Sequence, residues 1–211
     1  MVSQAGGMDV NSLIQRLRRL AMLDTSVFDE VRTDANATLP AIVVAVVSTL
    51  IFAIGGWLWW ILADIPDSPF YPGTGEIFIK SVIIGSIISV ILWAVWVGIT
   101  YVMLTQVFRA RADASELLRV MGFATAPLAI GLLMFIPALD FGIGLAAIGL
   151  FFGLTFIAVQ SATDAAAGRA LIATGAGFLV WCIVLALFVG QENILAPGFF
   201  VFDWGVELIR G

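Results

Sequence analysis

The chain has 211 residues, of which 61% are hydrophobic and only 12% are charged, and its formal net charge is −5. A soluble domain usually carries about 25% charged residues, so this composition is typical of a membrane protein. The sequence contains no histidine and a single cysteine, Cys182. These counts exclude histidine-based metal sites, a Ser-His-Asp triad and an intrachain disulfide. No basic run is long enough to predict nucleic-acid binding, and we expect no cofactor or metal.

The N-terminal arm, residues 1–38, contains the stretch NSLIQRLRRLAML at positions 11–23. Its apolar residues recur at helical spacing, and Ser12 followed by Gln15 fits a capping box, so we expect a short amphipathic helix. Three arginines lie on other sides of this helix: Arg16, Arg18 and Arg19. Two interpretations remain open, a helix in the membrane interface that contacts anionic lipid or a partner, and a helix packed under the bundle.

Five uncharged runs are long enough to cross a bilayer, whose apolar core of about 30 Å needs roughly 20 helical residues. The predicted spans are 39–63, 81–108, 120–139, 141–163 and 170–189. Pro137 and Asp140 mark a tight hairpin between the third and fourth spans, because one continuous helix would overshoot the membrane. We therefore expect an all-α polytopic membrane protein with a membrane domain at 39–189.

The distribution of cations predicts an orientation, because cytoplasmic loops are enriched in lysine and arginine. Eight of the ten cations fall on the side of the N-terminal arm and two fall on the other side. The N-terminus is thus expected in the cytoplasm and the C-terminus outside. Residues 190–211, which include Phe199, Phe200, Phe202 and Trp204, then form an extracytoplasmic aromatic tail at the interface.

Small residues repeat at four-residue spacing in the last two spans, at Gly149 and Gly153 and at Ala173 and Gly177. Such pairs let helix backbones approach closely in lipid. The pattern fits packing within one chain, and it also fits a homo-oligomer or a partner interface through Gly149 and Gly153.

No catalytic constellation is present in the predicted spans, which contain no aspartate, glutamate, lysine or arginine. Proton relays and coupled transport use intramembrane ionisable groups, so these spans argue against a pump and against an enzyme. A passive pore lined by hydroxyl groups stays open.

The stretch DASELLRVMGFATAP at 113–127 joins a charged helix start to an apolar segment. Asp113 with Glu116 is expected to cap a helix at the cytoplasmic surface. Pro127 removes a hydrogen bond from the Phe123 carbonyl within the membrane. We predict that the third span kinks near Phe123 and packs closely at Gly122.

The run from Tyr101 to Ala186 resembles the Yip (Ypt-interacting protein) membrane-domain family. The likeness is carried by YVMLTQVF, the charged break RARADASELLRV, the segment MGFATAP, the turn LLMFIPALDFGIG and the segment SATDAAAGRALIATG. The positions that map onto the family signature are Gly122, Phe123, Pro127 and Arg169. The DLYGP motif of eukaryotic members is missing, so a Rab GTPase partner is not carried over. The chain is more similar to the short bacterial members.

This resemblance implies a fold and a location, the bacterial cytoplasmic membrane, rather than an activity. We expect a non-enzymatic membrane scaffold or an accessory subunit of a larger assembly. The alternative is a passive channel or small-molecule exporter formed by oligomerisation. The expected partners are membrane lipids, anionic ones included, and a second copy of the chain or a larger membrane complex.

Overall fold

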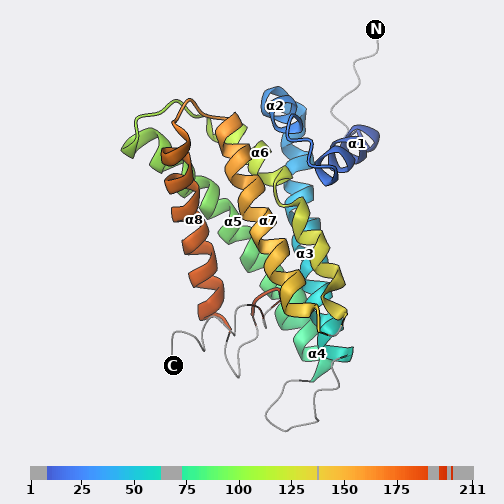
Figure 1. The fold of residues 1–211 in the computed structure, drawn as a ribbon. Coiled ribbons are helices and arrows are strands. Elements are labelled where there is room, and N and C mark those ends of the chain that lie inside the picture. The colour runs from blue at the N-terminus through green and yellow to red at the C-terminus, as the bar shows by residue number, and fades with distance from the viewer. Residues whose placement is uncertain (1–8, 63–72, 137, 190–194, 199–200, 202–211) are drawn as a thin grey trace.

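The computed structural model describes residues 9–62, 73–136, 138–189, 195–198 and 201, and this part of the chain is a helical bundle (Figure 1). The elements in chain order are α1 (Val10–Ala21), α2 (Val27–Thr33), η1 (Ala35–Ala37), α3 (Thr38–Leu62), α4 (Thr74–Ile77), η2 (Phe78–Gly85), α5 (Ser86–Val102), η3 (Met103–Val107), α6 (Ala114–Phe123), η4 (Ala126–Phe135), α7 (Asp140–Ser161) and α8 (Ala167–Leu187). Segments η1 and η4 are 3-10 helices, whereas η2 and η3 are π-helical.

Five helical segments of the described chain are long and apolar enough to cross a membrane, which confirms the predicted fold class. They are Ala35–Leu62, Thr74–Val107, Ala114–Phe135, Asp140–Ser161 and Ala167–Leu187. The second segment begins at Thr74, seven residues before the predicted start at 81. The Lys80 ammonium lies 2.5 Å from the Glu76 carboxylate, one helical turn away, so the charge is neutralised and the helix continues past it.

The third span is two helices rather than one. Asp113 caps α6 by accepting hydrogen bonds from the backbone N–H groups of Ser115 (2.9 Å) and Glu116 (3.0 Å). The α-helix ends at Phe123, and a 3-10 helix begins at Ala126 with Pro127 in its first turn. Proline lacks an amide hydrogen, so the first turn of a new helix is a position that tolerates it.

The spans pack into one core. Helix α3 contacts both halves of the third span, α7 contacts η4, and α5 packs along α8. An aromatic cluster joins α5, α7 and α8, with Trp96 and Phe151 ring centres 5.1 Å apart and Phe178 stacked on Trp181 at 6.0 Å. Aromatic pairs at these distances add to the burial of their large surfaces.

Two short helices cover the end of the bundle opposite α4 (Figure 1). Helix α2 buries Val27, Phe28 and Val31 completely and contacts α6. Helix α1 is capped by Asp9, whose carboxylate accepts from the Asn11 amide at 3.0 Å. The predicted cap at Ser12 was therefore wrong by one turn, and the Ser12 hydroxyl instead donates to the Asp9 carbonyl.

The end of the chain returns to the bundle at residues 195–198 and at 201. The Ser81 hydroxyl donates to the Ala196 carbonyl at 2.9 Å, and Val201 is buried next to Gly144. The four aromatic residues of the predicted interfacial tail lie outside the described residues.

Candidate functional site

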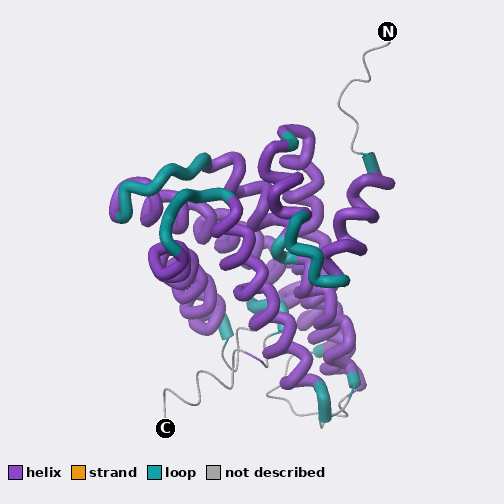
Figure 2. Tube along the Cα trace, turned by 45° about the horizontal axis from the view of Figure 1, so that its top comes forward, coloured by secondary structure: helices purple, strands orange, loops and turns teal. Residues whose placement is uncertain are grey.

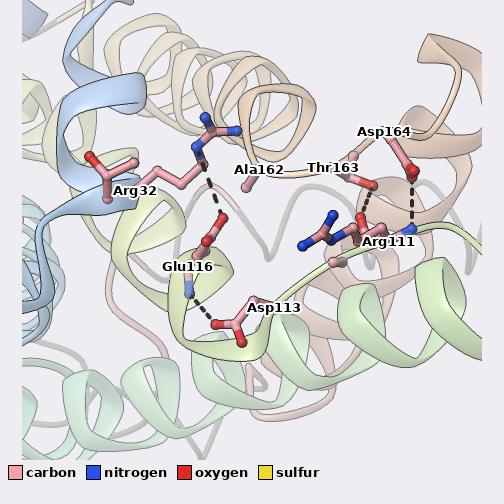
Figure 3. A pocket seen from close by; sticks show the side chains of 9 residues that line it. Arg32, Arg111, Asp113, Glu116, Ala162, Thr163 and Asp164 are labelled. Atoms are coloured by element: carbon pink, nitrogen blue, oxygen red, sulfur yellow. Dashed lines mark hydrogen bonds and ion pairs between the residues drawn. The ribbon is translucent and has the colours of Figure 1, made fainter.

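The end of the bundle that carries α2 contains a cavity of about 590 Å³. It opens between the C-terminal end of α2, the loop before α6 and the loop between α7 and α8 (Figure 3). The residues that line it are Arg32, Thr33, Arg111, Ala112, Asp113, Glu116, Ala162, Thr163 and Asp164.

Backbone and side-chain hydrogen bonds hold the two loops together. The Arg111 amide donates to the Asp164 carboxylate at 2.7 Å, and the Thr163 hydroxyl donates to the Arg111 carbonyl at 3.0 Å. Ala112 and Thr163 also form an isolated antiparallel bridge. Figure 2 shows these loops on the same end of the molecule. These hydrogen bonds fix one wall of the cavity, which consists of the two loops and contains no helix.

The floor of the cavity is the first turn of α6. The Ser115 hydroxyl, together with the amides of Glu116 and Ser115, hydrogen-bonds the Asp113 carboxylate and lowers its pKa below the usual range. Asp113 is therefore ionised at neutral pH. Since its carboxylate already accepts the free amides of this helix start, the helix N-terminus is not available to an external anion.

Arg32 closes the opposite wall and connects three elements. Its guanidinium donates to the Ser161 carbonyl at the end of α7, and its Nε lies 3.9 Å from the Glu116 carboxylate. The Arg32 carbonyl accepts two hydrogen bonds from the buried Arg119 guanidinium, at 2.6 and 3.2 Å. Arg119 thus bonds to the polypeptide backbone of α2 instead of extending to the water.

The charge arrangement of the cavity suits recognition. The Arg111 side chain extends toward the Glu116 side of the cavity (Figure 3) and forms no ion pair with any described carboxylate. Two arginines and three carboxylates line the space, for a net charge of −1 (+2 − 3). No described group of three histidine, cysteine or acidic side chains could hold a metal ion. The cavity thus presents charged groups of both signs.

The three arginines predicted to contact lipid or a partner have different surroundings. Arg16 is 9% exposed, and its guanidinium donates to Glu30 and Asp34, both at 2.8 Å. Arg19 pairs with Asp24 and Glu30, also at 2.8 Å. Arg18 is exposed and makes no ion pair within the described chain.

The signature positions lie at the break in the third span, apart from Arg169. Gly122 and Phe123 are buried, and an added Cβ at Gly122 would lie 2.7 Å from the Ala41 carbonyl oxygen of α3. Pro127 is half-buried in η4. Arg169 is exposed in the first turn of α8, outside the residues that line the cavity.

The four predicted packing positions differ in what surrounds them. Ala173 and Gly177 are buried against α5, and a Cβ added at Gly177 would lie 2.1 Å from the Trp96 ring. At Gly149 and Gly153 no described atom lies within 4 Å of an added Cβ. No described helix therefore closely covers α7 at these two glycines.

Sequence reasoning did not find the cavity. Arg32 and Arg111 contributed to the predictions only as two of the eight cations counted for orientation, and Asp164 did not contribute, although the topology already placed their segments on the same side of the membrane. The signal that was available is the polar Thr163–Asp164 pair in one short loop and Arg111 to Asp113 in the other. Which loops touch depends on helix packing, which no local motif encodes.

The five apolar helices and their single core define a multi-pass α-helical membrane protein. The Yip1 domain matches residues 22–189, which is most of the chain, so the protein belongs to the Yip1 domain family. The matched range begins just after α1 and includes every residue that lines the cavity. No curated protein and no solved structure matches the chain.

Proposed function

We propose that the protein is a non-enzymatic scaffold or accessory subunit that binds a segment of a partner in the cavity between α2, α6 and the two loops. The observation that carries this proposal is the preformed cavity with an unpaired guanidinium at Arg111. Its walls are fixed by hydrogen bonds before any partner arrives, so binding costs little ordering of the protein. The cavity lacks a nucleophile hydrogen-bonded to a base, which is the arrangement that acyl or phosphoryl chemistry needs.

The partner segment is expected to carry an acidic group against Arg111 and a basic group against Asp164 or Glu116. An arginine binds carboxylates with two parallel hydrogen bonds, which adds geometric selectivity. Such a segment belongs to a larger membrane complex or to a second copy of this chain.

Orientation is part of this proposal. The excess of lysine and arginine on the side of α1 and α2 supports a cytoplasmic N-terminus and an extracytoplasmic C-terminus. The resemblance to the short bacterial members supports a location in a bacterial cytoplasmic membrane. The cavity would then face the cytoplasm. A cysteine at Thr33 in a Cys182→Ala background should react with an impermeant maleimide only after the cells are opened. Labelling of intact cells would contradict this orientation.

Co-purification in mild detergent tests the function. The Arg111→Glu variant should lose a defined partner that the wild-type protein retains, because the new carboxylate repels the acidic group of the partner. Arg109→Glu is the matched control, since Arg109 is exposed in the same loop and does not line the cavity. Loss of the partner in both variants, or in neither, would contradict the proposal.

A passive channel or exporter formed by oligomerisation is the second candidate. The open side of α7 at Gly149 and Gly153 favours it, because bare helix backbone in lipid allows a second copy to approach closely. Solute flux through liposomes containing the purified protein alone would support this function, and the absence of flux at every protein density would exclude it.

A further inference from the structure

Helix α1 has an apolar arc that the protein covers only in part. At 100° per residue, Val10, Leu13, Ile14, Leu17 and Leu20 fall on one side of the helix. The edge that includes Leu13 and Leu20 is buried, whereas Val10 is 52% and Ile14 is 58% exposed. Two exposed apolar residues, Met22 and Leu23, directly follow the helix. The four exposed apolar residues of this segment, Val10, Ile14, Met22 and Leu23, make up its uncovered strip.

Helix α1 lies beside the spans at the end of the bundle that carries α2 (Figure 1). Helix α1 contacts η4, which is the second half of the third span, as well as α2. In Figure 1 it lies beside the upper part of α3 and on the side of α2 that is nearer the spans. Leu39, at the start of α3, is also more than half exposed. Helix α1 is thus adjacent to one of the spans.

The charges around α1 cancel. The segment 9–34 contains four arginines and five carboxylates, for a net charge of −1 (+4 − 5). Arg16 and Arg19 are paired with Asp24, Glu30 and Asp34 at 2.8 Å. A paired guanidinium has little attraction left for an anionic headgroup, and the surrounding acids oppose that attraction.

We propose that α1 is an interfacial anchor that inserts the strip Val10–Ile14–Met22–Leu23 into the acyl boundary of the bilayer crossed by the five spans. Burial of apolar surface holds it there. Arg16 and Arg19 are paired, so Arg18 is the one arginine of α1 left to attract anionic lipid, and the insertion does not require such lipid. This role differs from the expected attraction of all three arginines to anionic headgroups. It does not depend on the partner proposed for the cavity.

Fluorescence quenching of a bimane label tests the anchor. Single cysteines at Ile14 and at the neighbouring Gln15, in a Cys182→Ala background, are labelled and reconstituted into phosphatidylcholine vesicles. Gln15 is the matched control, because it is exposed on the polar side of the same helix turn. Lipids brominated near the headgroup end of the acyl chains should quench the label at 14 and spare the label at 15. Aqueous iodide should do the reverse.

The lipid composition then separates hydrophobic anchoring from electrostatic attraction. Replacing part of the phosphatidylcholine with phosphatidylglycerol should leave the quenching of the label at 14 unchanged. Quenching by bromine that appears only with phosphatidylglycerol would overturn the proposed mechanism. Equal iodide quenching at both positions would overturn the anchor, as would protection from both quenchers, which would mean that a second copy or another protein covers the strip.

Discussion

Thr125 links the break in the third span to α3. Its hydroxyl donates to the Gly122 carbonyl at 2.7 Å, and the Thr125 backbone amide donates to the same carbonyl at 3.2 Å. The Ser48 hydroxyl of α3 lies 3.0 Å from Thr125 and 2.6 Å from the Val44 carbonyl. Hydrogen bonds between side chains of neighbouring membrane helices add stability, so this pair of hydroxyls attaches the end of α6 to α3.

We expect Thr125→Val to lower the free energy of unfolding, because it removes both the bond to Gly122 and the contact with Ser48. Hydrogen bonds between membrane helices contribute about 0.6 kcal/mol on average and up to about 1.7 kcal/mol. Thr155→Val is the control, since the Thr155 hydroxyl bonds only to the Phe151 carbonyl within its own helix. Denaturation in detergent, followed by tryptophan fluorescence, measures both variants. Equal free energies of unfolding for the two variants would mean that the contact between Thr125 and Ser48 does not stabilise the protein.

Gly177 of α8 lies against the Trp96 ring of α5 with no room for a larger side chain. Alanine at this position would place its Cβ 2.1 Å from the Trp96 ring, whose indole nitrogen is held by a 2.9 Å hydrogen bond to the Thr174 carbonyl. Overpacking of this kind costs about 1–3 kcal/mol. Gly175→Ala, two residues earlier in α8, meets no described atom within 4 Å and is expected to be neutral or stabilising.

Thermal unfolding of the two alanine variants tests this difference. A lower melting temperature for Gly177→Ala alone is the expected result. A lower melting temperature for both variants would show that α8 tolerates no added methyl group. An unchanged melting temperature for both would show that Trp96 moves aside.

At the scale of the elements, α1 and α2 are joined mainly by ion pairs whose acids titrate below neutral pH. The hydrogen bond from Arg16 lowers the pKa of Glu30 and of Asp34 below their usual range. The Ser26 hydroxyl and then Arg19 lower the pKa of Asp24 to about 2. A carboxylate with a lowered pKa stabilises the folded arm above its ordinary pKa, and that stabilisation is lost as the pH falls through the lowered value.

The contact between α1 and α2 should therefore be unchanged from pH 7 to about pH 4.5 and should weaken toward about pH 2. Hydrogen exchange of residues 10–21, corrected for the intrinsic rate at each pH, should show faster opening in this window while the spans stay protected. Glu30→Gln should accelerate exchange in α1 already at pH 7, because it breaks the pairs to both Arg16 and Arg19. Unchanged protection of α1 down to pH 2 would contradict the role of these ion pairs.

The presence of the helices was predictable from the sequence, but the residues at which they begin and end were less predictable. The lengths of the apolar runs predicted five spans, and Asp113 predicted the start of α6, because both signals are local. The helix of the second span begins seven residues before the predicted start of the span, because a charge cancelled by its neighbour at Glu76 does not end a helix. The cap at Asp9 was missed because Ser12 with Gln15 matches the capping box, whereas Asp9 has a serine three residues later.

For the molecule as a whole, contacts between segments far apart in the chain determine which helix faces meet and where the cavity forms. The sequence did not predict these contacts. The glycine repeats of α7 and α8 have the same four-residue spacing, yet Gly177 is buried under Trp96 and Gly149 is open. Periodicity gives the side of a helix that small residues share but not the neighbour on that side. The cavity escaped prediction for the same reason, since its walls come from three parts of the chain that meet only in the bundle.

The cavity between α2, α6 and the two loops is proposed to receive a segment of a partner. Site-specific photo-crosslinking in growing cells tests it most directly, with benzoylphenylalanine placed at Thr163 in the cavity or at Ile87, an exposed apolar position on α5. We predict one discrete crosslinked product from position 163, which Arg111→Glu abolishes and Arg109→Glu preserves, and no such product from position 87. No product from position 163, or the same product from both positions, would contradict the account.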